Sequence, residues 1–162
     1  MATNVTIDVI GDIIKREGGV SNQSGDKGGL TFEGISQKSN PELFKNGLPT
    51  DAQVRATYEA KYIVGPGFDK ITDKLVQNQL IDWGVNSGPA VAISALQRIV
   101  GVPVDGVLGP GTLSAVSSMH PDDVNTSLVA ERVKMIGRLI TANPLQAKFA
   151  SGWLNRAVEF LR

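Results

Sequence analysis

The amino-acid sequence predicts a mainly α-helical protein that folds as one domain. Its 162 residues are 41% hydrophobic, which is enough for one well-buried core and too little for two ordinary domains. Apolar residues recur at helical spacing along most of the chain, and glycines and prolines punctuate these stretches without forming a low-complexity tract. We therefore expect about seven to nine helices and at most a small β element beside the first.

The first helix is expected to end at Glu17. The apolar residues that share one face of it are Val5, Val9, Ile10, Ile13 and Ile14. Glu17 follows Ile13 by four residues and falls on the apolar side, where partial desolvation favours the neutral form of a carboxyl group. Gly18 and Gly19 then end the helix. A carboxylate at a helix C-terminus opposes the helix dipole, and such a breach of local preference is typical of functional sites.

Turn signals follow this helix. Residues 20–34 are too rich in glycine and polar side chains for a helix, so we expect a loop or a short, irregular hairpin. Short helices are expected near 34–39 and 41–46. Thr50 and Gln53 have the spacing of a capping box, which predicts a helix that runs to about Val64.

The helical pattern resumes near Asp69 and is interrupted at Asn86-Ser87-Gly88-Pro89. Ser87 is predicted to cap the next helix, with Pro89 in its first turn. Further helices are expected at 89–100, from Thr112, at 122–142 and at 145–161.

Charge and composition exclude several classes of protein and site. The 16 basic and 16 acidic residues cancel and form no run of like charge, which argues against nucleic acid as the main partner. The chain has no cysteine, so disulfides, thiolate metal sites and cysteine nucleophiles are excluded. The single histidine, His120, precedes a proline and two acids that indicate a helix start, so a surface or capping role is expected.

The N-terminal stretch does not have the pattern of a secretory signal. Asp8 and Asp12 lie within its apolar part, and no basic leader precedes them. No segment approaches the roughly 20 apolar residues of a membrane span. We expect a monomer that is made in a bacterial cytoplasm and does not insert stably into a membrane.

The most informative residues lie between Glu17 and Ile35. Asp26 follows Glu17 by nine residues, and Thr31 follows Asp26 by five. The five glycines between these groups, at 18, 19, 25, 28 and 29, allow a bulky ligand to approach the backbone. Glu33 is the other acid nearby and is taken as a loop carboxylate. Glycosidases place two carboxyl groups around one sugar linkage, so the pattern indicates that chemistry.

This pattern, EGG followed by D-x-GG-x-T-x-x-GI, resembles the signature of the glycoside hydrolase family 108 muramidases, which occur as phage endolysins and in related bacterial proteins. The order Glu, Asp, Thr is also similar to that of the lysozymes of T-even phages. Further segments resemble the family in the same order: YEAKY (58–62), DWGVNSG (82–88), LQRIVGVPVDGVLGPGT (96–112) and GWLNR (152–156). The resemblance implies a lysozyme-like, two-lobed, mainly α fold in which residues 1–162 form one catalytic domain and residues 92–162 form a helical lobe within it.

The resemblance also implies roles for three residues. Glu17 would be the general acid, and Asp26 with Thr31 would hold a water on the opposite face of the sugar, so that the reaction inverts the anomeric configuration. No metal or organic cofactor is expected.

Three further residues are weaker candidates for contacts to the glycan. Tyr58 and Tyr62 lie four residues apart on one helix face, where aromatic residues more often belong to the core. Asn86 has the alternative role of a helix C-cap.

Residues 96–112 resemble the LQ…DGxxGPxT pattern of small peptidoglycan-binding modules. The alternative, which we favour, is that the Asp105-Gly106 and Gly109-Pro110-Gly111 turns are structural. The apolar residues expected to fill the core beside them are Leu96, Val100, Val104 and Leu108.

The function expected from the resemblance is hydrolysis of the β-1,4 bond between N-acetylmuramic acid and N-acetylglucosamine in peptidoglycan. The expected setting is host lysis by a phage endolysin that reaches the periplasm with a holin-type partner. One alternative is a lytic transglycosylase, but that enzyme does not need the water-positioning pair Asp26 and Thr31. The other is a non-catalytic wall-binding or phage structural protein of the same fold, against which the intact Glu, Asp, Thr set argues.

Overall fold

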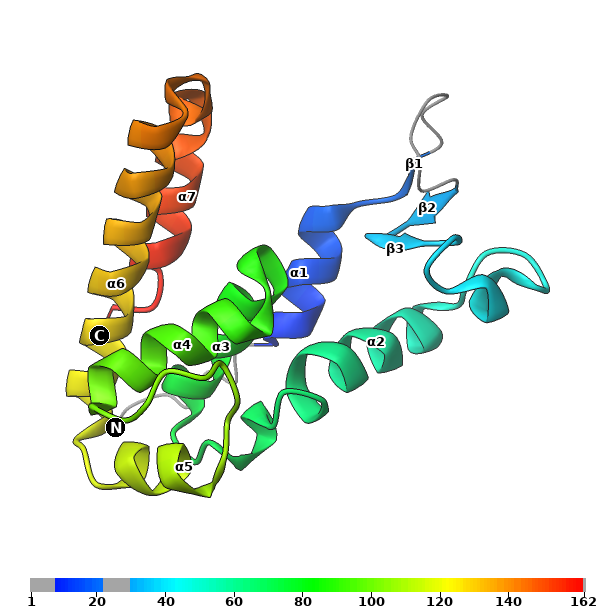
Figure 1. Ribbon diagram of the computed structural model, residues 1–162. Helices are drawn as coiled ribbons and strands as arrows, with labels where there is room; N and C mark the ends of the chain where they lie inside the picture. Colours follow the sequence, from blue (N-terminus) through cyan, green and yellow to red (C-terminus); the bar gives the residue numbers. More distant parts are fainter. Residues whose placement is uncertain (1–7, 22–29, 162) are drawn as a thin grey trace, which may run out of the picture. The chain divides into compact units, whose positions relative to one another are not determined.

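The computed structural model describes residues 8–21 and 30–161, and its contacts divide the chain into two compact units, Met1–Gly65 and Pro66–Arg162. Each unit is described by itself, with the element labels of Figure 1. Both units are mainly helical over the described residues, so the predicted α class is confirmed. None of the helices in the described ranges combines the length and the apolar character needed to cross a membrane.

The first unit contains two helices, a small sheet and short helical turns. Its elements are α1 (Val9–Glu17), β1 (Val20–Ser21), β2 (Thr31–Phe32), β3 (Ile35–Ser36), the 3-10 turn η1 (Pro41–Phe44), α2 (Asp51–Glu59) and the π-helical turn η2 (Ala60–Val64). The strands form an antiparallel sheet in the order β1-β2-β3, in which Phe32 pairs with both Val20 and Ile35. The expected small β element is therefore present, directly after α1.

Helix α1 packs against α2. The buried apolar side chains of the first unit, among the residues described, are Val9, Ile10, Ile13, Ile35, Phe44, Val54 and Tyr58. At the surface, Nη2 of Arg55 on α2 lies 2.7 Å from Oδ1 of Asp8, the N-cap of α1. The core and this ion pair together hold α1, and with it Glu17, on α2.

The outcomes of three local predictions for this unit differ. The capping box is confirmed: the backbone N of Thr50 donates to Oε1 of Gln53 at 2.9 Å, and the backbone N of Gln53 donates to Oγ1 of Thr50 at 3.3 Å. The helix expected near 34–39 is wrong, because a two-residue turn at Glu33 and Gly34 starts β3 there. The segment near 41–46 forms only the short turn η1.

The regular elements of the second unit, among its described residues, are helices and helical turns. Its elements are the 3-10 turn η3 (Phe68–Lys70), α3 (Lys74–Ser87), α4 (Pro89–Val100), α5 (Pro110–Ser117), α6 (Pro121–Ala142), the 3-10 turn η4 (Pro144–Phe149) and α7 (Ala150–Val158). Helix α6 contacts α3 and α4, and α7 packs along α6, as Figure 1 shows. The core between these helices includes Leu80, Trp83, Leu96 and Leu128.

Most helix ends in this unit agree with the sequence patterns. Pro89 begins α4, and Nδ1 of His120 accepts a hydrogen bond from the backbone N of Asp122 at 3.3 Å, which confirms its capping role. The prediction that Ser87 caps α4 is wrong, because Ser87 is the last residue of α3 and Gly88, with φ of 94°, separates the two helices.

One predicted core position is also wrong. Val104 is 50% exposed, whereas Leu96 and Leu108 are buried. The buried side chain of Gln97 lies between α4 and the turn instead, where its Oε1 accepts hydrogen bonds from the backbone N atoms of Asp105 and Gly106.

Candidate active site

Glu17 is the last residue of α1, at the point where the chain leaves the helix for the sheet. Gly18 and Gly19 follow it with φ of 46° and 56°, a left-handed conformation that glycine adopts without strain. The backbone N of Gly18 donates to the carbonyl of Ile14 at 3.2 Å and closes the last turn. The two glycines thus end α1 as predicted and redirect the chain into β1.

The turn between β2 and β3 lies against Glu17. Its two residues, Glu33 and Gly34, have φ of 47° and 81°, as a primed two-residue hairpin turn requires. The backbone N of Glu33 donates to the carbonyl of Gly19 at 3.0 Å, which attaches the turn to the chain just after α1. A Cβ at position 34 would come within 3.3 Å of Cγ of Glu17 and would collide with the hydroxyl of Tyr58. Only glycine fits between these two side chains.

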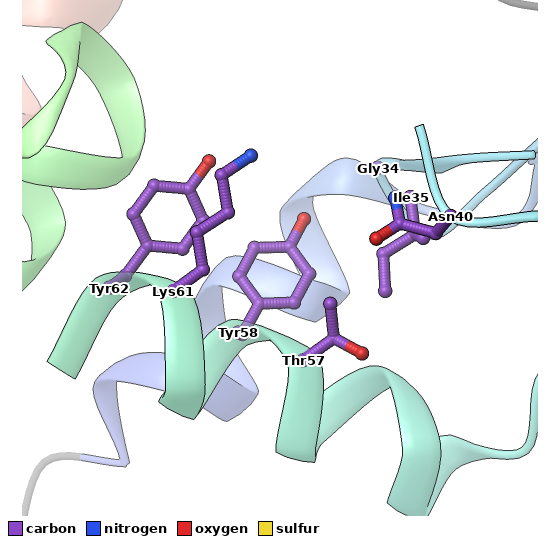
Figure 2. A pocket seen from close by; sticks show the side chains of 7 residues that line it. All are labelled: Gly34, Ile35, Asn40, Thr57, Tyr58, Lys61 and Tyr62. Carbon is purple, nitrogen blue, oxygen red and sulfur yellow. The ribbon is translucent and has the colours of Figure 1, made fainter. Parts of the chain in front are cut away.

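A pocket of about 40 Å³ lies beside this turn, as shown in Figure 2. Its lining residues are Gly34, Ile35, Asn40, Thr57, Tyr58, Lys61 and Tyr62. The rings of Tyr58 and Tyr62 project from α2 and η2 with their hydroxyl groups on the same side, and the ring centroids are 5.7 Å apart. Nζ of Lys61 lies 5.1 Å from the centroid of the Tyr62 ring. Aromatic walls with a few polar groups are typical of small-molecule sites.

Tyr58 connects this pocket to two carboxyl groups. Its hydroxyl donates a hydrogen bond to the carbonyl oxygen of Glu33 at 3.0 Å. Burial raises the pKa of Tyr58 to about 12, and the negative charges of Glu17, Tyr62 and Glu33 act in the same direction. The geometry agrees, because a Cβ on Gly34 would meet both the Tyr58 hydroxyl and Cγ of Glu17. Tyr58 is therefore a neutral hydrogen-bond donor at neutral pH.

Glu33 has a more specific environment than the sequence indicated. It has a positive φ, a conformation that costs a residue other than glycine about 1–3 kcal/mol. Its side chain is half-buried, and Oε2 is buried without a hydrogen-bond partner within the described ranges. The strained backbone and a buried carboxylate oxygen without a partner among the described residues make Glu33 a candidate functional residue. The Glu-Gly pair between Phe32 and Ile35 was the signal that could have revealed the turn.

Two of the three predicted catalytic residues, Glu17 and Thr31, lie within the described ranges. Glu17 is exposed, so the partial burial expected for it is wrong: the buried stripe of α1 ends at Ile13, and the last turn of the helix faces solvent. Thr31 is half-buried in β2, the middle strand of the sheet that begins three residues after Glu17. Asp26 lies outside the described residues.

Of the three predicted glycan contacts, two lie together. Tyr58 and Tyr62 line the pocket beside Gly34, and Tyr58 is also a core residue, as the alternative proposed. Asn86 belongs to the second unit, where it is exposed and its Nδ2 donates to the backbone carbonyl of Asp82 one turn earlier. It lines a separate pocket with Arg132 and Arg156, to which the sequence analysis assigned no role.

Comparisons with known proteins agree with this arrangement. Residues 10–88 match the family described as Glycosyl hydrolase 108, and residues 91–158 match the family described as Predicted Peptidoglycan domain. The chain is also similar to the solved structure described as that of Brucella abortus SagA, with 27% sequence identity, a TM-score of 0.64, and coverage of 95% of this chain and 94% of that chain. No curated protein gives a significant match.

The first match takes in Glu17, the hairpin turn and both tyrosines, and the second takes in most of the second unit. The resemblance found in the sequence is thereby confirmed, as is the mainly α, lysozyme-like fold. The likeness to the glycosyl hydrolase 108 family thus extends over residues 10–88, and the likeness to the predicted peptidoglycan domain follows it at residues 91–158.

Proposed function

We propose that this protein is an N-acetylmuramidase that hydrolyses the β-1,4 bond between N-acetylmuramic acid and N-acetylglucosamine in peptidoglycan. Its glycosyl hydrolase family and its peptidoglycan domain support a role in peptidoglycan hydrolysis. The observation that carries the assignment is the position of Glu17, an exposed acid at the end of α1 and next to a tyrosine-lined pocket.

In this mechanism Glu17 donates a proton to the leaving oxygen. Asp26 and Thr31 hold the attacking water on the opposite face of the sugar, and the oxocarbenium-like transition state is stabilised by charge. The single hydroxyl proton of Tyr58 is donated to the carbonyl of Glu33, so its oxygen orients the protonated Glu17 carboxyl or the N–H of a sugar acetamido group as a hydrogen-bond acceptor. No step of this mechanism needs a metal ion or an organic cofactor.

The first test is the substitution Glu17→Gln, which keeps the size of the side chain and removes its proton. Loss of a general acid lowers the rate by roughly 100-fold or more, so lysis of purified cell walls, followed by turbidity, should fall by at least that factor. Glu42→Gln, at an exposed acid of η1 paired with Lys45, is the control and should retain the parental rate. Glu33→Gln is measured beside them. If Glu17→Gln stays within a few fold of the parent while Glu33→Gln is inactive, the general acid is Glu33.

The second test concerns the products. We expect reducing muropeptides by mass spectrometry and an α anomer first by proton NMR, because Asp26 follows Glu17 by nine residues on a separate loop, which leaves room for water between the two acids. Inverting pairs are about 6.5–9.5 Å apart, against about 5–5.5 Å for a directly attacking carboxylate. A 1,6-anhydro product would identify a lytic transglycosylase, and a β anomer seen before mutarotation would contradict inversion.

The same proposal places the protein in phage biology. It acts as an endolysin: a monomer made in the host cytoplasm, released to the periplasm by a holin-type partner, and antibacterial through lysis of the host. This setting rests on the resemblance of EGG and D-x-GG-x-T-x-x-GI to phage endolysins. Lysis timing in a host that expresses the protein with and without a holin tests it.

A further inference from the structure

The second unit contains a pocket of about 160 Å³ that is lined by residues of α3, α6 and α7, including two arginines. We call it the arginine pocket. Its apolar wall is formed by Met135, Ile136, Leu139 and Trp153. Arg132 and Arg156 supply the polar part, and Asn86 and Ser87 complete the lining. The pocket thus has one apolar side and one cationic side.

The two arginines share one buried carboxylate. Nη2 of Arg132 donates to Oδ2 of Asp82 at 2.7 Å, and Nε of Arg156 donates to Oδ1 of Asp82 at 2.9 Å. The Asp82 and Arg132 side chains are only 3% and 5% exposed, and that of Arg156 is 17% exposed. Oδ2 of Asp82 also accepts from Nε of Arg156 at 3.1 Å and from Nδ2 of Asn86 at 3.4 Å. The capacity of Asp82 to accept hydrogen bonds is therefore filled.

Donors of both guanidinium groups remain unused. Nη1 of Arg132 is buried and has no hydrogen-bond partner among the residues described. Nη2 of Arg156 lies 2.7 Å from Oδ1 of Asp82 as an ion pair but makes no aligned hydrogen bond. The centroid of the Trp83 ring lies 5.9 Å from Cζ of Arg132. A buried donor without an acceptor is costly. Both arginines line the pocket, so an anionic group bound there would lie beside the two guanidinium groups.

The charges near the pocket are two guanidinium groups and two carboxylates, of which Asp82 is buried and Glu159 is exposed. Burial lowers the pKa of Arg132, and Asp82 and the exposed Glu159 of α7 act against this shift by attraction. The two guanidinium groups face one carboxylate inside the unit, and Glu159 contributes from the surface. Arginine forks match carboxylates well, because two N–H groups can point at two oxygens.

We propose that the arginine pocket binds a carboxylate group of the peptide stem of peptidoglycan, with an adjacent alanine-sized apolar group against Trp153 and Leu139. This inference rests on the proposed function, which supplies the polymer. The pocket residues Arg132, Trp153 and Arg156 all lie within the predicted peptidoglycan domain. The second unit would thus recognise the peptides while the first unit cleaves the glycan.

The decisive measurement compares two ligands on the unaltered, full-length protein. Isothermal titration calorimetry is run with a free tetrapeptide stem that has its natural carboxylates and with the same peptide fully amidated. We expect the acid to bind about tenfold or more tightly than the amide, because a charge-assisted hydrogen bond is lost with each amidated group. Equal affinities, or binding of neither peptide, would overturn the proposal. Acetate at the same concentration is a further arm: if it competes as well as the stem, the pocket is a general anion site and the stem assignment is wrong.

A matched pair of variants locates the binding in the pocket. Met135 lies three residues after Arg132 on α6 and is half-buried in the pocket wall. Met135→Glu places a carboxylate beside Arg132 and should weaken stem binding by about tenfold or more. Met135→Gln introduces a side chain of the same length without the charge, and its affinity for the stem should fall clearly less. Equal losses for the two variants, with both shown to be folded by circular dichroism, would place the carboxylate elsewhere.

Failure of this inference can be distinguished from failure of the proposed function. Glycan strands stripped of their peptides by an amidase test the cleavage alone, and Glu17→Gln should abolish it. Cleavage of stripped glycan without stem binding contradicts only the arginine pocket. Stem binding without cleavage contradicts only the proposed muramidase activity.

Discussion

Position 34 requires glycine for three reasons. The turn needs a positive φ there, Cγ of Glu17 lies close on one side, and the Tyr58 hydroxyl lies on the other. The Tyr58 hydroxyl in turn donates to the carbonyl of Glu33, which holds the strained residue of the turn in place. The geometry around Glu17 therefore depends on a residue with no chemistry of its own.

Gly34→Ala is expected to lower the free energy of unfolding by more than about 2 kcal/mol. A positive φ costs alanine about 1–3 kcal/mol, and the added methyl group would also collide with the Tyr58 hydroxyl. Urea unfolding measures this loss. Gly47→Ala is the matched control, because Gly47 has φ of 109° but nothing within 4 Å of an added Cβ. Equal losses for the two variants would show that the close approach to Tyr58 has no energetic role.

Single residues were predictable from sequence where their neighbours in the chain decide their state. The caps at Thr50 and His120, and the end of α1 at Glu17, depend on groups within a few positions. Glu33 was not predictable in this way, because its positive φ goes against the preference of glutamate and its carbonyl is held by Tyr58, 25 residues away. The exposure of Glu17 could not be derived either, since it depends on where the packing against α2 ends.

At the scale of elements, α4 holds the following turn through one side chain. Gln97 is 1% exposed, and its Oε1 accepts from the backbone N atoms of Asp105 at 3.1 Å and Gly106 at 2.9 Å. Its Nε2 donates to Oδ1 of Asp105 at 2.7 Å, and it also lies within hydrogen-bond distance of the Val107 carbonyl and Oγ1 of Thr112. The bonding capacity of this buried amide is thus filled by the segment 105–112, which favours a structural role for the segment.

Asp105→Ala should therefore lower the melting temperature more than it weakens binding to purified peptidoglycan. The substitution removes the acceptor of both Nε2 of Gln97 and the backbone N of Val107. Thermal unfolding and a wall pull-down measure the two effects. An Asp105→Ala protein with an unchanged melting temperature that no longer binds the wall would make the segment a binding site.

The pH dependence of stability tests the role of the Asp105 carboxylate independently. Hydrogen bonds from the Gln97 side chain and then from the Val107 backbone lower the pKa of Asp105 below its ordinary 3.8. The charged carboxylate therefore stabilises the fold above the unfolded-state pKa, and this contribution disappears as the pH falls through the lower folded-state value. The stability difference between wild type and Asp105→Asn should be full at about pH 6 and shrink below about pH 4. A difference that does not change over this range would contradict the role of the charge.

Element boundaries were predictable where glycine or proline sets them. Pro89 and Gly101 delimit α4 as expected, because a proline fits the first turn and a left-handed glycine ends the last. The strand β3 was mistaken for a helix, since a strand of two residues has no periodicity to detect. Apolar spacing predicts Val104 in the core, but it does not reveal that the buried residue holding this turn is the polar Gln97.

At the scale of the whole molecule, the two units differ in the size of their cores. Seven buried apolar residues belong to the first unit and seventeen to the second, among the residues described. A unit of fewer than about 70–80 residues rarely derives more than about 3–5 kcal/mol from its core. The first unit, which carries Glu17 and the hairpin turn, is therefore expected to be the less stable part of the chain.

The chain contains natural probes for this difference. Both tyrosines, Tyr58 and Tyr62, lie in the first unit, and both tryptophans, Trp83 and Trp153, lie in the second. Second-derivative ultraviolet absorbance separates the two signals, so each unit can be followed during one urea titration. We expect the tyrosine transition at a lower urea concentration than the tryptophan transition.

Two matched core substitutions complete this test. Val54 in the first unit and Val124 in the second are both 0% exposed, so replacing either by alanine removes the same buried groups at a cost of about 2 kcal/mol. Val54→Ala should shift mainly the tyrosine transition, and Val124→Ala mainly the tryptophan transition, because each cavity weakens its own core. If the transitions coincide in the parent and each substitution moves both equally, the chain unfolds as one cooperative domain, and the site around Glu17 has the stability of the whole molecule.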